Sequence, residues 1–282
     1  MSDVTPIDAR RTWRNLEAVH GMIYFTPHAG PEYDRVGVSN QRTGYFASRA
    51  AAMGAVEAEV VIATFFNFNP SLVRHAMDGV WSITTPEAML EARLRAVDVS
   101  LRSAFDDDLL ASADLARTAA DVREAALLAC EFTSGRPLFA GHVALEWPDE
   151  PHLVLWHAQT LLREFRGDGH IAALVTEGLN GLDALISHGA SGDVPAPVLQ
   201  ATRAYSDDEW AAGVASMAER GLVTADGAAT DAGRAQRERI EDLTDRLAAA
   251  PWQALGADRC KTLRAMGRVL SAKIVESGLM NR

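Results

Sequence analysis

The sequence has little cysteine, and its two cysteines lie far apart. Cys130 and Cys260 form no CxxC pair within the 282 residues. A disulfide framework and a thiolate metal site both need grouped cysteines, so neither is expected. This usage is typical of a reducing compartment, and we predict a cytoplasmic protein.

Long hydrophobic runs are also missing. The longest candidate, residues 60–66, falls far short of the roughly 18 apolar residues that span a bilayer, and the first ten residues contain no apolar signal core. We therefore expect a soluble protein without a membrane partner. Apolar residues still make up 48% of the chain, enough for a packed core, and the length suits two domains of about 100–200 residues each.

Basic charge is in deficit. The chain has 27 Lys and Arg against 38 Asp and Glu, a net charge of −11. Residues 196–282 are neutral, with twelve residues of each sign, so residues 1–195 carry the whole deficit. Nucleic-acid binders commonly present a basic patch, and DNA is therefore not expected as a partner.

The common catalytic motifs are absent. The sequence contains no P-loop, GxGxxG, nucleophile elbow, SxxK or zinc signature. Support for the common hydrolases and nucleotide enzymes is correspondingly weak. The sequence names no cofactor and predicts no metal site.

What the sequence does contain is helical periodicity with clear caps. Apolar residues recur at helical spacing over residues 12–25, and Asn69 and Thr85 each stand before a proline as N-caps. A helix is also expected over residues 57–66, although its β-branched run leaves a strand as the alternative. The fold class that follows is mainly α.

Glycine and proline mark the expected interruptions. Residues 30–44 are predicted to be a loop, long enough to act as a lid. Gly167 and Gly169 are expected to break the helix that begins near residue 152, with Asp168 capping the next helix. Turn residues gather over 189–197, and we place the domain boundary there: a helical, ligand-pocket domain over residues 1–192 and a second domain over residues 193–282.

The second domain has the order of a winged helix. A helix over 198–205 is followed by the Ser206 capping box and a helix over 207–220. Residues 222–230 resemble a short two-stranded ribbon, and a long polar helix follows over 231–249. We expect a winged-helix-like domain with further C-terminal helices.

Five segments carry a family resemblance: residues 13–25, 65–70, 163–170, 230–234 and 240–247. They resemble an actinobacterial family of helical proteins often catalogued as helix-turn-helix or MarR-like. The resemblance covers nearly the whole chain, whereas only the C-terminal part resembles MarR-like regulators. It implies that the helix over 207–220 would enter the major groove of DNA.

The residues argue against that role. Asp207, Asp208 and Glu209 lead this helix, and residues 225–230 contain no Lys or Arg to contact phosphates. Packing or dimerisation, including a homodimer, is the alternative use of such a module.

One candidate site surrounds the predicted helix break. His157 and Glu164 are seven residues apart and share a helix face, and the break would turn His170 back toward them. We predict catalytic roles for these three and ligand-binding roles for Arg166 and Asp168. The spacing does not match a metal motif, although two imidazoles and a carboxylate could form a metal triad. Ion pairs and a helix cap are the structural alternative.

A second candidate set lies in the N-terminal part. His20 and Tyr24, four residues apart, could act as a catalytic proton acceptor and donor. Arg49 could bind an anion, and the Asn67 and Asn69 amides could hold a flat ligand. A buried core histidine and a helix cap are the structural alternatives.

Together these features favour a small-molecule-binding protein, with an enzyme of unknown reaction as one form of it. The ligand pocket would lie in the N-terminal domain, and the winged helix would serve packing or dimerisation. The alternative is a ligand-responsive MarR-like regulator that binds DNA. A structural or interaction protein is the third reading.

Overall fold

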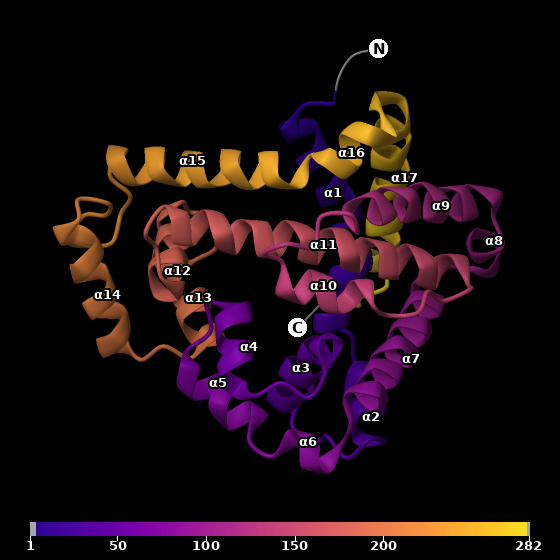
Figure 1. The fold of residues 1–282 in the computed structure, drawn as a ribbon, viewed down its shortest axis with the longest axis horizontal. Helices are drawn as coiled ribbons and strands as arrows, with labels where there is room; N and C mark the ends of the chain where they lie inside the picture. The colour runs from indigo at the N-terminus through magenta and orange to yellow at the C-terminus, as the bar shows by residue number, and fades with distance from the viewer. Residues whose placement is uncertain (1–3, 281–282) are drawn as a thin grey trace. The chain divides into compact units, whose positions relative to one another are not determined.

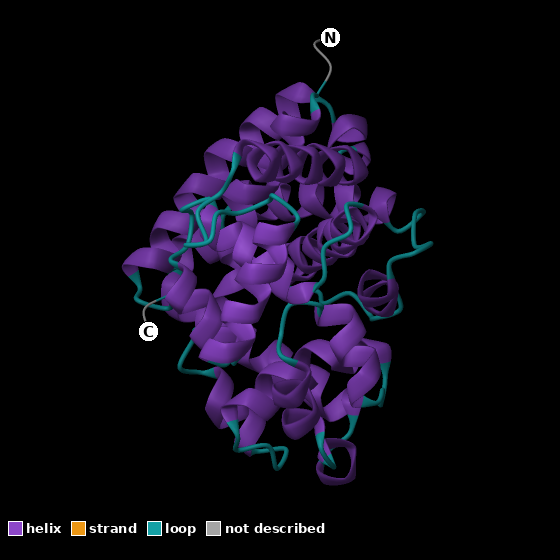
Figure 2. Cartoon of the chain, turned by 90° about the vertical axis from the view of Figure 1, so that its left-hand side faces the viewer, coloured by secondary structure: helices purple, strands orange, loops and turns teal. Residues whose placement is uncertain are grey.

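The computed structural model describes residues 4–280, and the chain is mainly α-helical, as the sequence predicts (Figure 1). Within these residues no β-strand is formed (Figure 2). We also find no helix here that combines the length and the hydropathy needed to span a bilayer. The chain divides into two compact units. Unit 1 comprises Met1–Val56, Gly79–Asp168 and Asp245–Arg282, and unit 2 comprises Glu57–Asp78 and Gly169–Thr244.

Unit 1 is built from the N-terminal, central and C-terminal helices of the chain. Its elements are α1 (Pro6–Gly21), η1 (Met22–Tyr24), α2 (Ala29–Asp34), α3 (Gln41–Ala50), η2 (Ala51–Met53), α6 (Val80–Ile83), α7 (Pro86–Ala104), α8 (Asp107–Leu110), α9 (Ala113–Ala129), α10 (Pro137–Val143), α16 (Ala250–Leu255) and α17 (Ala257–Glu276). Helices α11 (Pro151–Thr176) and α15 (Asp231–Ala248) contribute residues to both units.

The remaining helices form unit 2. They are α4 (Ala58–Phe65), α5 (Pro70–Met77), α12 (Gly181–Ala190), α13 (Ala196–Arg203) and α14 (Asp207–Glu219). Both units use segments from either side of residue 192, so the boundary predicted there does not separate them. That residues 1–192 fold alone stays a prediction.

In unit 1 the first and last helices pack against each other. Helix α17 lies along α1, and a side chain at Gly267 would stand 2.7 Å from the carbonyl oxygen of Asn15. Helix α9 packs on α16 and α17, not chiefly on α7 as its position after α7 suggests. Helices α2 and α3 pack on α7.

The predicted loop over residues 30–44 is wrong over most of its length, because α2 and the start of α3 occupy it and only residues 35–40 between them are non-helical. Pro31 lies in the first turn of α2, where the missing N–H is not needed. Asn40 caps α3 by accepting hydrogen bonds from two backbone N–H groups. Gly44 lies within α3, where a Cβ would stand 2.7 Å from the Tyr33 ring. Its glycine therefore serves close helix packing and not a turn.

The predicted break at Gly167–Gly169 is also wrong, since α11 runs without interruption from Pro151 to Thr176. Each glycine in a helix costs about 1 kcal/mol relative to alanine, a cost that burial of neighbours such as Phe165 can offset. Asp168 does not cap its own helix. Its carboxylate instead accepts the backbone N–H of Phe139 at 3.0 Å, in the first turn of α10.

Unit 2 contains a helix-turn-helix. Helix α13 ends at Arg203, and Ala204, whose backbone is left-handed (φ 59°), begins a three-residue turn into α14. Ser206 and Glu209 form the predicted capping box. Of the predicted ribbon, one antiparallel bridge is present, between Val223 and Ala229, with Gly227 in the turn. This single bridge does not form the predicted two-stranded ribbon, so the winged helix stays a prediction. Residues 58–65 form a helix and not the alternative strand.

Candidate functional site

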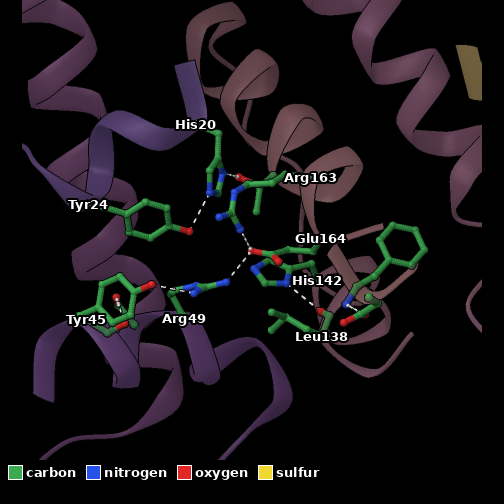
Figure 3. Close-up of polar contacts among 12 residues, drawn as sticks. His20, Tyr24, Tyr45, Arg49, Leu138, His142, Arg163 and Glu164 are labelled. Carbon is green, nitrogen blue, oxygen red and sulfur yellow. Dashed lines mark hydrogen bonds and ion pairs between the residues drawn. The ribbon is translucent and has the colours of Figure 1, made fainter. Parts of the chain in front are cut away.

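A buried polar cluster lies in unit 1, where side chains of α1, η1, α3 and α11 meet (Figure 3). Four of the predicted site residues belong to it: His20, Tyr24, Arg49 and Glu164. Arg163, Tyr45 and His142 lie beside them and are also labelled in Figure 3. The side chains come from distant parts of the sequence, so the tertiary fold alone brings them together.

Glu164 is the anionic centre of the cluster and is 3% exposed. It accepts a hydrogen bond from Arg163 at 3.0 Å and a longer one from Arg49 at 3.5 Å. Burial by itself would raise the pKa of Glu164, but the two guanidinium groups outweigh it and hold the pKa at about 2. Glu164 is therefore a charged carboxylate at neutral pH and not a proton donor.

The two arginines that contact Glu164 each have a further polar partner. Arg163 also donates to Glu17 through Nε at 3.0 Å, and Arg49 donates to the Tyr45 hydroxyl at 2.8 Å. Burial raises the pKa of Glu17. The result is a partly buried series of ion pairs and hydrogen bonds that runs from α1 through α11 to α3.

His20 and Tyr24 form the predicted pair. The Tyr24 hydroxyl oxygen lies 2.8 Å from Nε2 of His20, and Nδ1 of His20 lies 2.8 Å from Oγ1 of Thr160. Because the Thr160 hydroxyl donates to the Trp156 carbonyl, His20 donates from Nδ1 and accepts the Tyr24 proton at Nε2. Burial lowers the pKa of His20 well below its ordinary value, so the ring is neutral.

Two cations face the Tyr24 ring. The guanidinium carbons of Arg49 and Arg163 each lie 5.4 Å from its centroid. Burial raises the pKa of Tyr24, while the two cations oppose that effect. The pair can thus present a hydroxyl beside a neutral base in a positively charged surrounding.

His157 shares the surroundings of this cluster through His142. Burial lowers the pKa of His142 to about 4 and that of His157 to about 3, so both rings are neutral. Nδ1 of His142 donates to the Leu138 carbonyl at 2.9 Å, which leaves its Nε2 as an acceptor. Nε2 of His142 and Nε2 of His157 are buried without a hydrogen-bond partner in the described chain.

His170 does not join the cluster. It belongs to unit 2, where Nδ1 lies 2.9 Å from Thr244 Oγ1. On the uninterrupted α11, a spacing of six residues puts His170 on a different face from Glu164. The predicted turn that would bring them together is therefore wrong.

The other predicted ligand-binding residues have structural contacts. Arg166 pairs with Asp245 at 2.8 Å, and its guanidinium lies 5.0 Å from the Trp13 ring. Burial raises the pKa of Asp168, the residue that caps α10, to about 6. Asn69 caps α5 and donates to both carboxylate oxygens of Glu209, at 3.0 and 3.1 Å. Asn67 precedes this cap in unit 2.

Arg93 is the residue that the sequence analysis missed. It lies on α7, is 2% exposed and donates to the Ser48 carbonyl at 3.2 Å. Its neighbours Glu91 and Arg95 form an exposed i,i+4 ion pair, which makes the segment look like a solvated face. Helical spacing could have identified Arg93 as buried, because it is four residues from both Met89 and Val97 on the buried face of α7.

The described residues provide no grouped metal site, and three clefts of the structure lie away from the cluster. Among residues 4–280, no three His, Cys, Asp or Glu side chains are placed to hold a metal ion. Clefts of about 500 and 570 Å³ lie in unit 2 and one of about 400 Å³ in unit 1, each lined by residues outside the cluster.

The helix-turn-helix unit is strongly acidic. Unit 2 holds 6 Lys and Arg against 15 Asp and Glu, a net charge of −9, and unit 1 holds 21 against 23, a net charge of −2. The leading carboxylates of α14 are held within unit 2: Asp207 accepts from Gln200, and Glu209 accepts from Asn69 and the Ser206 backbone. Carboxylates therefore lead the second helix of the helix-turn-helix.

Comparison with known proteins gives one match. Residues 9–281 match a helix-turn-helix family. No curated protein and no solved structure matches the chain. Because the matched range is nearly the whole sequence, and α13 and α14 supply the helix-turn-helix, the chain belongs to this helix-turn-helix family.

Proposed function

We propose that the protein binds a polar small molecule at the buried cluster of unit 1. The observation that carries this proposal is a group of buried nitrogen atoms without partners in the described chain, on Arg93, Trp156, His142 and His157. Leaving a buried polar group unsatisfied costs about 1–3 kcal/mol, so such groups concentrate where a ligand or water completes them. The Tyr24–His20 pair supports proton exchange with the ligand, the step that an enzyme at this site would use.

A thermal-shift screen tests this function. A ligand at a hundred times its Kd stabilises the folded state by about 2.7 kcal/mol, a rise of several degrees in Tm. Wild-type protein is screened against a metabolite library that includes cations, anions and neutral compounds. Tyr24→Phe, which removes the hydroxyl and keeps the ring, is expected to weaken binding, whereas Tyr205→Phe in unit 2 is the matched control. A library without any stabilising compound, or equal binding by both variants, would contradict the proposal.

Family membership favours a second function, a ligand-responsive DNA-binding regulator. Against it stands the acidic helix-turn-helix unit, and we propose that this unit serves packing or dimerisation. Fluorescence anisotropy with a genomic-fragment pool at physiological salt decides between the two. A specific operator is typically bound at about 10⁻⁸ M or tighter. Affinity of that order would establish the regulator and refute our assignment of unit 2.

A further inference from the structure

Arg93 has an open hydrogen-bonding edge in the core of unit 1. Nη1 donates to the Ser48 carbonyl, but Nε and Nη2 have no partner among the described residues. Within the same residues, no carboxylate lies within 4 Å of the guanidinium. Leaving a charged group buried and unpaired is among the most costly arrangements in a protein core.

Other arginines of this chain show what that edge binds. Arg239 uses Nε and Nη2 to hold the two carboxylate oxygens of Glu177, at 3.3 and 2.9 Å. Arg74 holds Glu59 with the same two nitrogens, at 2.7 and 3.3 Å. These parallel N–H groups match the spacing of carboxylate oxygens. Arg93 therefore presents a carboxylate-binding edge that no described residue occupies.

Arg93 is the cation of this group without an ion-pair partner among the described residues, since Glu164 acts on it only from beyond ion-pair distance. Arg49 and Arg163 are paired with Glu164, and Arg163 also with Glu17. The nearby histidines His142 and His157 are neutral and contribute no balancing charge. A bound anion would therefore pair with the Arg93 guanidinium, which has no ion-pair partner among the described residues.

Trp156 supplies a second open donor at the same place. The Arg93 guanidinium carbon lies 5.2 Å from the Trp156 ring centroid, and the indole Nε1–H is buried without a partner in the described chain. An indole N–H can only donate, so it too calls for an acceptor atom. A carboxylate supplies acceptors to both groups.

We infer that Arg93 anchors the carboxylate of the bound molecule, so that the ligand is a small carboxylic acid. The inference rests on the proposed function of unit 1 and narrows it to one ligand class. The anion binds through both Nε and Nη2, with Trp156 as the neighbouring donor. Arg93 is then a binding residue and not a structural one.

A panel of small aliphatic and aromatic carboxylic acids, each with its primary amide, tests the ligand class on the wild-type protein. Because Arg93 is buried, samples are incubated before heating so that a local opening can admit the ligand. One or more acids are expected to raise Tm, and their amides are not, because an amide has no charge to balance the guanidinium. Equal shifts by amides, or by chloride and phosphate at the same concentration, would overturn the carboxylate assignment.

Variants test the residue. Arg93→Met removes the charge and keeps the length, so we expect at least a tenfold loss of acid binding by calorimetry with an unchanged or higher Tm. Arg93→Lys should also lose at least tenfold in affinity for the acid, since an ammonium group lacks the two parallel N–H groups that hold both carboxylate oxygens. Arg95→Met, on the same helix but paired with Glu32 at 2.9 Å, is the control and should bind normally. Acid binding retained by both Arg93 variants would overturn the inference.

The outcomes separate this inference from the proposed function. If neutral or cationic compounds bind in a Tyr24-dependent manner and acids do not, the proposed function stands and the carboxylate inference falls. If no compound of any class binds, both fall. The acid and amide comparison uses only wild-type protein, so it remains decisive even if Arg93→Met fails to fold.

Discussion

Replacing Glu164 with glutamine removes the one charge that faces both Arg163 and Arg49. The pKa of Glu164 is about 2, against 4.5 for an unperturbed glutamate carboxyl. Each tenfold change in proton affinity corresponds to about 1.4 kcal/mol, so the ionised carboxylate stabilises the folded state by about 3 kcal/mol at neutral pH. Breaking a buried ion pair from one side typically costs 3–5 kcal/mol. We therefore expect Glu164→Gln to lower the free energy of unfolding by at least about 3 kcal/mol.

Urea denaturation followed by tryptophan fluorescence measures this loss. A change of this size should lower Tm by roughly 6–12 °C for a protein of this length. Glu124→Gln is the matched control, because Glu124 makes the same kind of contact with Arg259 but is exposed. The control is expected to show no measurable change. A loss below about 1 kcal/mol for Glu164→Gln would refute the reasoning.

The pH dependence gives an independent check. Because the pKa of Glu164 is lower in the folded state, its stabilising effect is complete above about pH 4.5 and is lost as the pH falls toward 2. At pH 3 less than half should remain, about 1 kcal/mol. The difference between wild type and Glu164→Gln should therefore shrink on acidification. A difference that is the same at pH 7 and pH 3 would show that charge is not its cause.

Two further predictions use the same denaturation assay. Because the pKa of Asp168 is raised to about 6 from 3.8, its ionised form costs stability above pH 6, and the cost disappears below about pH 3.8. Asp168→Asn keeps an acceptor for the Phe139 N–H, so it should stabilise by about 1–3 kcal/mol at pH 8 and not at pH 4; destabilisation at pH 8 would contradict this. Asn69→Ala should cost about 1–3 kcal/mol, since it removes a helix cap and the bonds to Glu209, whereas Asn67→Ala should stay within about 0.5 kcal/mol. Equal losses of stability in Asn69→Ala and Asn67→Ala would show that the cap and the bonds to Glu209 do not distinguish the two residues.

Short sequence patterns predicted the helix caps, which depend on neighbouring residues alone. The caps at Asn69, Thr85 and Ser206 were predictable because a cap depends on residues within one helical turn. Gly44 and Gly167 misled the prediction because glycine has two uses, and the choice depends on distant partners. A ring from α2 packs on Gly44, a contact that no pattern within residues 30–44 reveals.

For the buried polar cluster of unit 1, the sequence indicated several of the residues but not the side-chain contacts between distant ones. His20 and Tyr24 are four residues apart on the chain, so their contact followed from helical spacing. Arg49 and Glu164 are 115 residues apart, and only the tertiary fold pairs them. Arg93 escaped notice because a buried charge contradicts the ordinary expectation that arginine faces water.

The pairing of α1 with α17 fixes when unit 1 can form during synthesis. Helix α1 ends at Gly21 and its partner at Glu276, so the apolar face of α1 is made 255 residues before its partner is complete. At about 5–20 residues per second, that wait lasts from roughly ten seconds to almost a minute. Over this interval the face is exposed to chaperones and to other nascent chains, and a message truncated before α17 would produce a polypeptide whose first helix never finds its partner.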